Sequence, residues 1–207
     1  KNCTFMEVKD VGWPGNSMNR FNFFKKVIDK FLDFDFVFFY QANAAFVQHF
    51  DIDLKKNNNK IITFKHPFVN SKKKCARPYE RNTYSSAYIK YFEEPDYYIA
   101  AGAFGAKPSL IKSMSIEILE MINRDKKKGI VPIWHDESYF NKYLSDKFEQ
   151  LSIFDYEYIY PQTHYLSKKP IVLLRDKSKY FDVETFKKSF NQKAYNKNYK
   201  KNFIKFI

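Results

Sequence analysis

The 207-residue sequence predicts an α/β fold in which helices cover the faces of a sheet. Segments with apolar residues at helical spacing alternate with short apolar or aromatic runs, which is typical of this class. Hydrophobic residues make up 44% of the chain and include 23 Phe, enough for a buried core despite a formal net charge of +13. Composition and length therefore exclude a chain that is disordered throughout and fit one domain with an appendage.

The first part of the chain predicts one helix and two strands. Residues 17–32 carry large apolar side chains at helical spacing and predict the first helix. The aromatic run at 34–40 predicts a buried strand, and a second short strand is expected at 61–64. The segment 66–94 is rich in Lys, Tyr and Ser without clear periodicity, so we expect it to be mostly loop.

The second part continues the alternation. Residues 97–104 predict a strand that ends in small residues, and 108–128 predict an amphipathic helix whose last turn carries three lysines. A brief strand is expected at 130–134 and a helix at 136–148. The last predicted strand, at 171–174, precedes the C-terminal segment.

The positive charge is concentrated at the C-terminal end. Residues 177–207 hold nine Lys against Asp182 and Glu184, which places seven of the thirteen net charges there. We therefore predict a domain at 1–176 and a basic, aromatic tail at 177–207. Aromatic residues between the lysines of this tail favour either a helix on an anionic membrane surface or a helix packed on its own domain, with equal weight.

Cysteine usage and apolar run length limit the location of the protein. Cys3 and Cys75 lie far apart without a CxxC spacing, so neither a disulfide framework nor a structural zinc site is expected. The longest uninterrupted apolar stretch, 36–40, is far shorter than a membrane-spanning helix needs. We expect a cytoplasmic protein, which would be peripheral on the inner face of the membrane if the tail binds that surface rather than its own domain.

The strongest local signal is the run of Trp134, His135, Asp136 and Glu137 between a predicted strand and a predicted helix. One interpretation is structural, because acidic residues stabilise the first turn of a helix. The other is functional, because ligands of α/β proteins bind at the carboxyl edge of a parallel sheet. The residues alone leave both open.

Two further segments are candidates for ligand contacts. Gln41 and Asn43 end a predicted strand where many nucleotide-sugar enzymes have two carboxylates that hold a cation, and neutral amides are poor ligands for such an ion. A simple turn explains them equally well. The small-residue run at 98–106 permits close approach of a ligand or close packing of a helix.

Taken in order, these motifs resemble glycosyltransferase family 6, the retaining enzymes that make the blood group A and B antigens and the α-1,3-galactosyl epitope. The resemblance spans about residues 8 to 180, and W-H-D-E-S-x-x-N-K-Y at 134–143 is its most specific part. It implies a GT-A type, Rossmann-like nucleotide-sugar fold with a central mixed sheet flanked by helices. The family has a nucleotide-binding βα unit ahead of 12–14, and we expect the fold here without that unit.

The resemblance also implies the site residues. Glu137 is expected to face the anomeric carbon, as nucleophile or as stabiliser of a cationic sugar, and to contact the acceptor. The other residues expected to contact the acceptor are His66 and Trp134. The residues expected to bind the donor are Arg20, Gln41, Ala42, Asn43, Ala100, Ala101, Gly102, Asp136, Arg175 and Lys177.

The reaction implied is retaining α-1,3 transfer of N-acetylgalactosamine from UDP-GalNAc to a galactose-terminated glycan, with or without fucose on it. Gly102 ends the donor-selecting triplet, where glycine goes with UDP-GalNAc and alanine with UDP-galactose. Gln41 and Asn43 resemble the amide pair of metal-independent bacterial members, so no metal and no cofactor are expected, and Arg175 and Lys177 would neutralise the departing diphosphate.

Two features of the sequence depart from the family pattern. Gln41 stands where the metal-free members have Asn, and Arg77-Pro78 replaces residues that contact the acceptor in the mammalian enzymes. The alternatives are an α-1,3-galactosyltransferase that uses UDP-galactose, a transferase-like protein without activity, and, from another class, a basic module that binds an anionic surface or nucleic acid. We do not expect nucleic acid as a partner, because no RNP, KH or zinc-finger signature is present.

Overall fold

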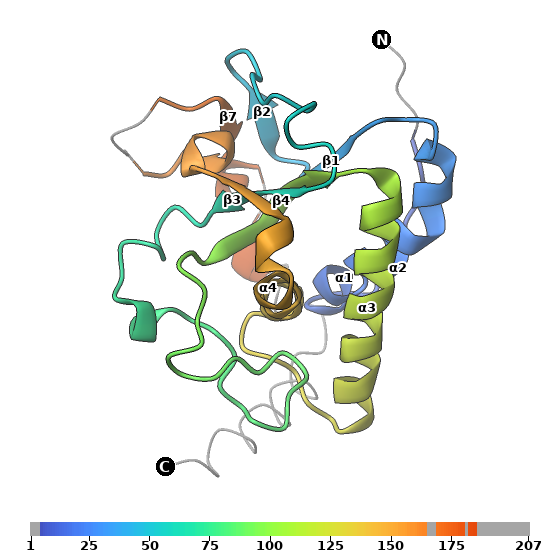
Figure 1. Ribbon diagram of the computed structural model, residues 1–207, viewed down its shortest axis with the longest axis vertical. Helices are drawn as coiled ribbons and strands as arrows, with labels where there is room; N and C mark the ends of the chain where they lie inside the picture. Colours follow the sequence, from blue (N-terminus) through green and yellow to red (C-terminus); the bar gives the residue numbers. More distant parts are fainter. Residues whose placement is uncertain (1–4, 165–168, 181, 186–207) are drawn as a thin grey trace.

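The computed structural model describes residues 5–164, 169–180 and 182–185 (Figure 1). Most of the predicted tail lies outside these residues, so its predicted amphipathic helix and the predicted domain boundary stay predictions. Within the described part of the chain, no helix is both long enough and apolar enough to cross a membrane.

A four-stranded mixed sheet forms the centre of the molecule, as predicted. Its strands are β1 (Val37–Tyr40), β3 (Ile61–Lys65), β4 (Ile99–Ala106) and β5 (Leu151–Phe154), in the order β1-β4-β3-β5. Strand β4 is antiparallel to both neighbours, whereas β3 and β5 are parallel. All eight residues of β4 are buried, which places this strand at the middle of the fold.

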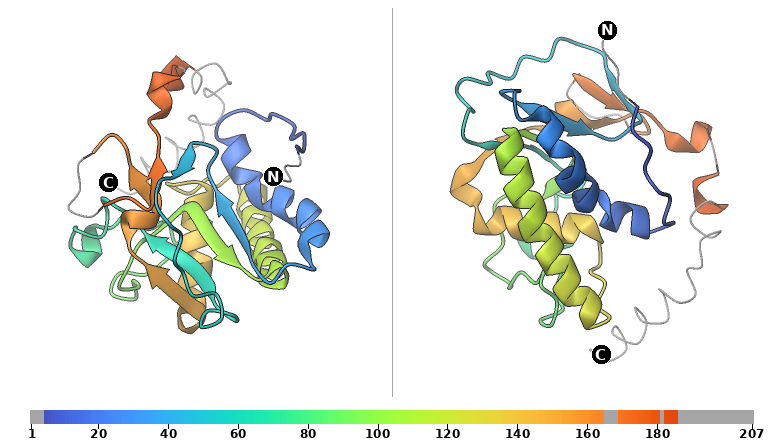
Figure 2. Two further views of the ribbon diagram at one scale, coloured as in Figure 1. Left: turned by 90° about the horizontal axis from the view of Figure 1, so that it is seen from above. Right: turned by 90° about the vertical axis from the view of Figure 1, so that its right-hand side faces the viewer.

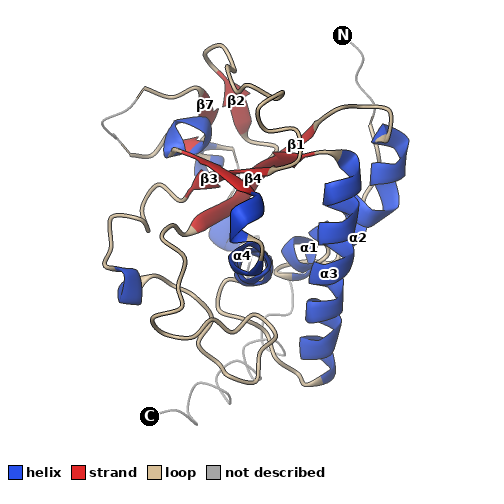
Figure 3. Cartoon of the chain, in the orientation of Figure 1, coloured by secondary structure: helices blue, strands red, loops and turns tan. Residues whose placement is uncertain are grey.

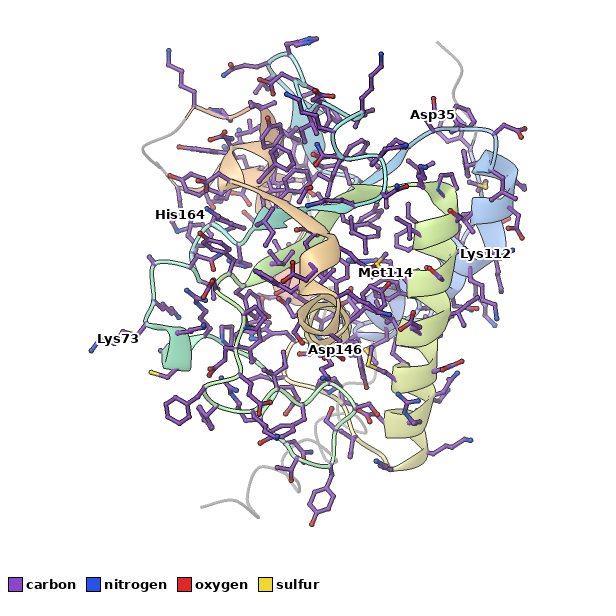
Figure 4. The ribbon with its side chains drawn as sticks, viewed as in Figure 1. Asp35, Lys73, Lys112, Met114, Asp146 and His164 are labelled. Atoms are coloured by element: carbon purple, nitrogen blue, oxygen red, sulfur yellow. The ribbon has the colours of Figure 1, made fainter. Side chains whose placement is uncertain are left out.

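Helices cover one face of this sheet. They are α1 (Gly15–Met18), α2 (Arg20–Val27), α3 (Pro108–Lys127) and α4 (Asp136–Asp146). Figures 1 and 3 show α2, α3 and α4 on the same side of the central strands. Phe21, Phe104 and Phe140 are fully buried between them, and Met114, labelled in Figure 4, adds its side chain from α3. This aromatic layer fixes where α2 and α4 lie relative to β4.

A smaller sheet covers the other face. Its strands are β2 (Ala44–Phe46), β6 (Tyr160–Pro161) and β7 (Val172–Leu174), in the order β2-β7-β6. Both views in Figure 2 show it beside the central sheet and away from α3. Short 3-10 helices complete the described fold, at Ile28–Phe31, Lys74–Ala76, Phe148–Gln150, Tyr156–Ile159 and Lys177–Lys179.

The sequence predicted the larger elements and missed the shorter ones. The helix expected at 17–32 is present in three pieces, α1, α2 and the 3-10 turn at Ile28–Phe31. Strands β2, β5 and β6 were not predicted, because runs of two to four residues are too short to show a period.

The strand predicted at 130–134 is wrong, since this segment is an irregular turn. Pro132 has no N–H to give to a ladder. The Ile133 N–H donates instead to the Glu80 carboxylate at 2.7 Å, and the Trp134 N–H donates to Ser138 Oγ at 3.0 Å. Because these two N–H groups bond to side chains, they are not available to pair with a neighbouring strand.

Gly105 makes the β1–β4 pairing possible. It pairs with Phe38, and a Cβ built on Gly105 would lie 2.3 Å from two atoms of the Phe38 ring. The ring therefore packs directly on the glycine backbone.

We predict that Gly105→Ala lowers the free energy of unfolding by about 1–3 kcal/mol, because the new methyl group forces the Phe38 ring out of its place. Urea denaturation measures the change. In a Phe38→Leu background the same substitution should cost clearly less, and an equal cost in both backgrounds would show that the ring is not the obstacle.

Candidate active site

The candidate site lies where α4 begins beside β4. His135 precedes the helix with a positive φ of 51°, and its ring contacts that of Trp13 edge to face, with the centroids 5.1 Å apart. The turn brings Asp136 and Glu137 to the first turn of α4, as the sequence suggested. The predicted setting is wrong, however, because they follow an irregular turn and face the antiparallel strand β4.

Both carboxyl oxygens of Glu137 accept hydrogen bonds, one from β4 and one from Tyr98, the residue just before it. Oε2 accepts a hydrogen bond from the Ala101 N–H at 2.9 Å, and Oε1 accepts one from the Tyr98 hydroxyl at 3.1 Å. Glu137 is therefore held in one orientation beside the residues predicted to select the donor sugar. The structure brings these two predicted groups together.

Burial changes the ionisation of Glu137. The loss of water around the carboxyl group raises its pKa to about 7, although the Ala101 N–H and the Tyr98 hydroxyl favour the charged form. The neighbouring Asp136 adds to the upward shift. A carboxyl group whose pKa is shifted towards neutrality is a common feature of catalytic acids and nucleophiles.

Asp136 and Arg20 form a second connection between the helices and β4. The Arg20 guanidinium lies 3.1 Å from Asp136 Oδ2, donates a hydrogen bond to the Ala101 carbonyl and lies over the Phe39 ring. Burial raises the pKa of Asp136 while Arg20 opposes the shift. Arg20 thus connects Asp136 to the backbone of Ala101.

Asn141 completes the attachment one helical turn after Glu137. Its side-chain amide accepts from the Ile99 N–H at 3.0 Å and donates to the Ile99 carbonyl at 2.8 Å, so it pairs with β4 as a strand residue does. The same amide donates to the Glu137 carbonyl at 3.0 Å. The motif at 134–143 contained Asn141, but only the fold shows that it docks α4 onto β4.

The amide pair that ends β1 contacts the segment after β7. Lys177 Nζ donates to Gln41 Oε1 at 3.0 Å, and Asn43 Nδ2 donates to the Arg175 carbonyl at 2.7 Å. The Arg175 N–H in turn donates to the Asn43 carbonyl at 3.0 Å. Residues more than 130 positions apart in sequence are therefore adjacent, and four predicted donor-binding residues form one cluster.

The predicted acceptor residues are more dispersed. The His66 ring contacts the Tyr98 ring, with the centroids 5.9 Å apart, and the Tyr98 hydroxyl bonds to Glu137. In space, the Tyr98 side chain therefore lies between His66 and Glu137. Burial lowers the pKa of His66 to about 4, and the imidazole is neutral near pH 7. Trp134 is about half exposed and precedes the acidic pair. Both positions are compatible with an apolar sugar face.

Two of the predicted donor residues have no polar side-chain role here. Ala42 is exposed, and the buried side chain of Ala100 belongs to the core cluster on the opposite face from Ala101. Tyr98 was not predicted. Its only signal was its place at the start of the buried small-residue strand, where a large hydroxyl-bearing side chain is unusual.

Comparisons with known proteins define the class of protein. The chain matches the sequence model of Glycosyltransferase family 6 over residues 2–185. This match covers most of the chain, so the protein belongs to glycosyltransferase family 6 and is a glycosyltransferase. The resemblance seen in the sequence motifs is thereby confirmed.

Individual relatives agree with this family. The chain is 29% identical over 180 residues to the "O-antigen biosynthesis glycosyltransferase WbnI" of Escherichia coli, covering 86% of this chain and 74% of that protein. It is 35% identical over 79 residues to "Histo-blood group ABO system transferase 1" of Rattus norvegicus, covering 38% of this chain and 22% of the rat protein. For the second rat transferase the identity is 32% over 79 residues, covering 38% and 23%.

The raised pKa of Glu137 predicts a pH dependence of stability. Between the ordinary pKa of 4.5 and about 7, the folded state keeps a proton that the unfolded state has lost. Raising the pH through this window therefore lowers the free energy of unfolding, by on the order of 1–2 kcal/mol.

Urea denaturation of the wild type and Glu137→Gln at pH 5 and pH 8 measures this contribution. The wild type should lose more stability than the variant between the two values, because glutamine does not titrate. Equal losses would mean that the carboxyl group ionises as readily in the folded protein as in the unfolded chain.

Proposed function

We propose that the protein is a retaining α-1,3-N-acetylgalactosaminyltransferase that moves GalNAc from UDP-GalNAc to a galactose-terminated glycan without a metal ion. The observation that carries the proposal is the hydrogen bond between Glu137 Oε2 and the Ala101 N–H, 2.9 Å long. This bond supports the proposal because it joins Glu137, the proposed nucleophile, to Ala101 of the triplet that resembles the donor-selecting positions.

Retention of configuration requires a group on the face of the sugar opposite the acceptor. In the ionised form, Glu137 either bonds to the anomeric carbon as UDP leaves or stabilises the cationic sugar electrostatically. The acceptor hydroxyl then attacks the anomeric carbon, the bond to Glu137 breaks where one has formed, and the hydroxyl proton passes to a phosphate oxygen of the departing UDP. The hydrogen bonds from Tyr98 and Ala101 keep the carboxylate in place during this sequence.

The departing diphosphate needs positive charge nearby. In the segment after β7, the Lys177 ammonium donates to Gln41 Oε1, and Arg175 pairs with Asn43 through its backbone while its guanidinium lies over the Tyr180 ring. A cation coordinated by Gln41 Oε1 would lie beside the Lys177 ammonium and be repelled by it. We therefore propose that Lys177 and Arg175, together with Arg20, supply the charge that a metal supplies in D-x-D enzymes.

The donor is proposed from Gly102 and the acceptor from the relatives. Through the family resemblance, glycine at the third place of the triplet goes with the 2-acetamido group of UDP-GalNAc. The E. coli relative is named for O-antigen biosynthesis and the rat relatives for the histo-blood group system, and both names favour a glycan acceptor. We also propose a cytoplasmic location, with the basic tail at the inner face of the membrane.

UDP-galactose is the second candidate donor, since Ala100 and Ala101 leave the rest of the triplet small. A binding module without catalysis is disfavoured by family membership and by the buried, oriented carboxylate of Glu137.

Competition between donors tests the proposal. With equal concentrations of UDP-GalNAc and UDP-galactose and a galactose-terminated acceptor, we expect the product to carry mainly GalNAc, by at least tenfold. Mass spectrometry of the product measures the ratio. Mainly galactosylated product would favour the alternative donor.

The Glu137→Gln variant is the matched control for this assay. It keeps the shape of the side chain but removes the carboxylate, so transfer should fall at least a hundredfold. Full activity in this variant would show that the Glu137 carboxylate takes no part in the reaction.

Metal independence gives a second test. We expect transfer to persist in EDTA, and Lys177→Ala to reduce kcat about tenfold or more because the leaving diphosphate loses a positive charge. Lys179→Ala, which removes an exposed lysine of the same 3-10 helix, is the control and should change kcat little. Activity lost in EDTA and restored by Mn²⁺ would contradict the proposal.

A further inference from the structure

The side chain of Gln41 lies across the α-carbon of Gly102. A Cβ built on Gly102 would be 3.0 Å from Gln41 Nε2 and 3.4 Å from its Cδ. The backbones are joined as well, since the Gln41 N–H donates to the Gly102 carbonyl at 3.1 Å. The Gln41 side chain therefore packs directly against Gly102, with its polar amide at the position where a larger residue would carry its Cβ.

Lys177 determines which way this amide points. An ammonium group only donates hydrogen bonds, and Lys177 Nζ lies 3.0 Å from Gln41 Oε1. The carbonyl end of the amide must therefore face Lys177, and the NH₂ end faces Gly102. Among the residues that the structure describes, no acceptor is bonded to Gln41 Nε2, so this donor is available to a ligand.

We infer that Gln41 is a specificity-determining residue, whose Nε2 donates a hydrogen bond to the carbonyl oxygen of the donor's 2-acetamido group. The inference rests on the proposed use of UDP-GalNAc and adds a hydrogen bond to the selection that is proposed for Gly102. Galactose has a hydroxyl group at this position and lacks the carbonyl. A site that offers a directed donor discriminates against a ligand without the matching acceptor.

The Lys177 contact links this selection to the diphosphate. The two ends of the Gln41 amide make this link, because Oε1 is bonded to Lys177 and Nε2 faces Gly102. The longer side chain of glutamine, compared with asparagine, allows it to span from Lys177 to Gly102. This gives a physical role to the residue at which the sequence departs from the amide pattern of its metal-free relatives.

Substitutions that keep the length of the side chain test the inference. Gln41→Met removes the N–H donors without adding charge, and we expect the ratio of kcat/KM for UDP-GalNAc to that for UDP-galactose to fall about tenfold. Gln41→Glu keeps the shape and the Lys177 contact but replaces the donor by an acceptor, and the ratio should fall at least as far. Because both substrates carry the same diphosphate, effects through Lys177 cancel in the ratio.

The control is Gln150→Met, the same substitution at an exposed residue of the 3-10 helix Phe148–Gln150, which should leave the ratio unchanged. A ratio within twofold of the wild type in Gln41→Met would overturn the inference, even if Gln41→Glu lowers it, because only charge repulsion would then be seen. Wild-type transfer of GalNAc combined with an unchanged ratio refutes this inference alone. Wild-type transfer of neither sugar, or of galactose only, refutes the proposed donor and the inference together.

Discussion

The arrangement of the site depends on how β4 is held beyond the end of β1. The ladder between these strands ends at the pair Tyr40 and Ala103. At Ile99 and Ala101 the backbone N–H and C=O groups bond instead to the side chains of Asn141, Glu137 and Arg20. Buried backbone groups need partners, and here polar side chains of α2 and α4 provide them. The same hydrogen bonds orient the carboxylate that the proposed chemistry needs.

This constraint combines stability and function in one set of contacts. Glu137 is buried at a cost that raises its pKa, and the hydrogen bonds from Ala101 and Tyr98 offset part of that cost. For Asp136 the offset is electrostatic, since the Arg20 guanidinium, 3.1 Å from Oδ2, opposes the upward shift of its pKa. A carboxylate in water would be easier to ionise but free to rotate. Burial makes Glu137 harder to ionise, but its hydrogen bonds fix the orientation of the carboxyl group next to the strand where the donor sugar is proposed to bind.

The segment after β7 lies beside the amide pair at the end of β1, although the two are far apart in sequence. Lys177 and Arg175 reach Gln41 and Asn43 because β7 pairs with β2, which follows the amide pair directly. The small sheet thus has a specific role: it places the basic residues at the end of β1. The overall charge of +13 says little about this, since a net charge does not show which basic residues lie beside the amide pair.

The sequence by itself determined the α/β class, the helices α2, α3 and α4, and the family, because long periodic segments and the motif at 134–143 are local signals. Only the tertiary structure decided that 130–134 is a turn, that Asn141 and Glu137 bond to β4, and that Gln41 lies over Gly102 with its NH₂ group toward it. These features are pairings between residues 36 to 136 positions apart. Their hydrogen bonds depend on how the chain packs, and no local pattern of residues encodes them.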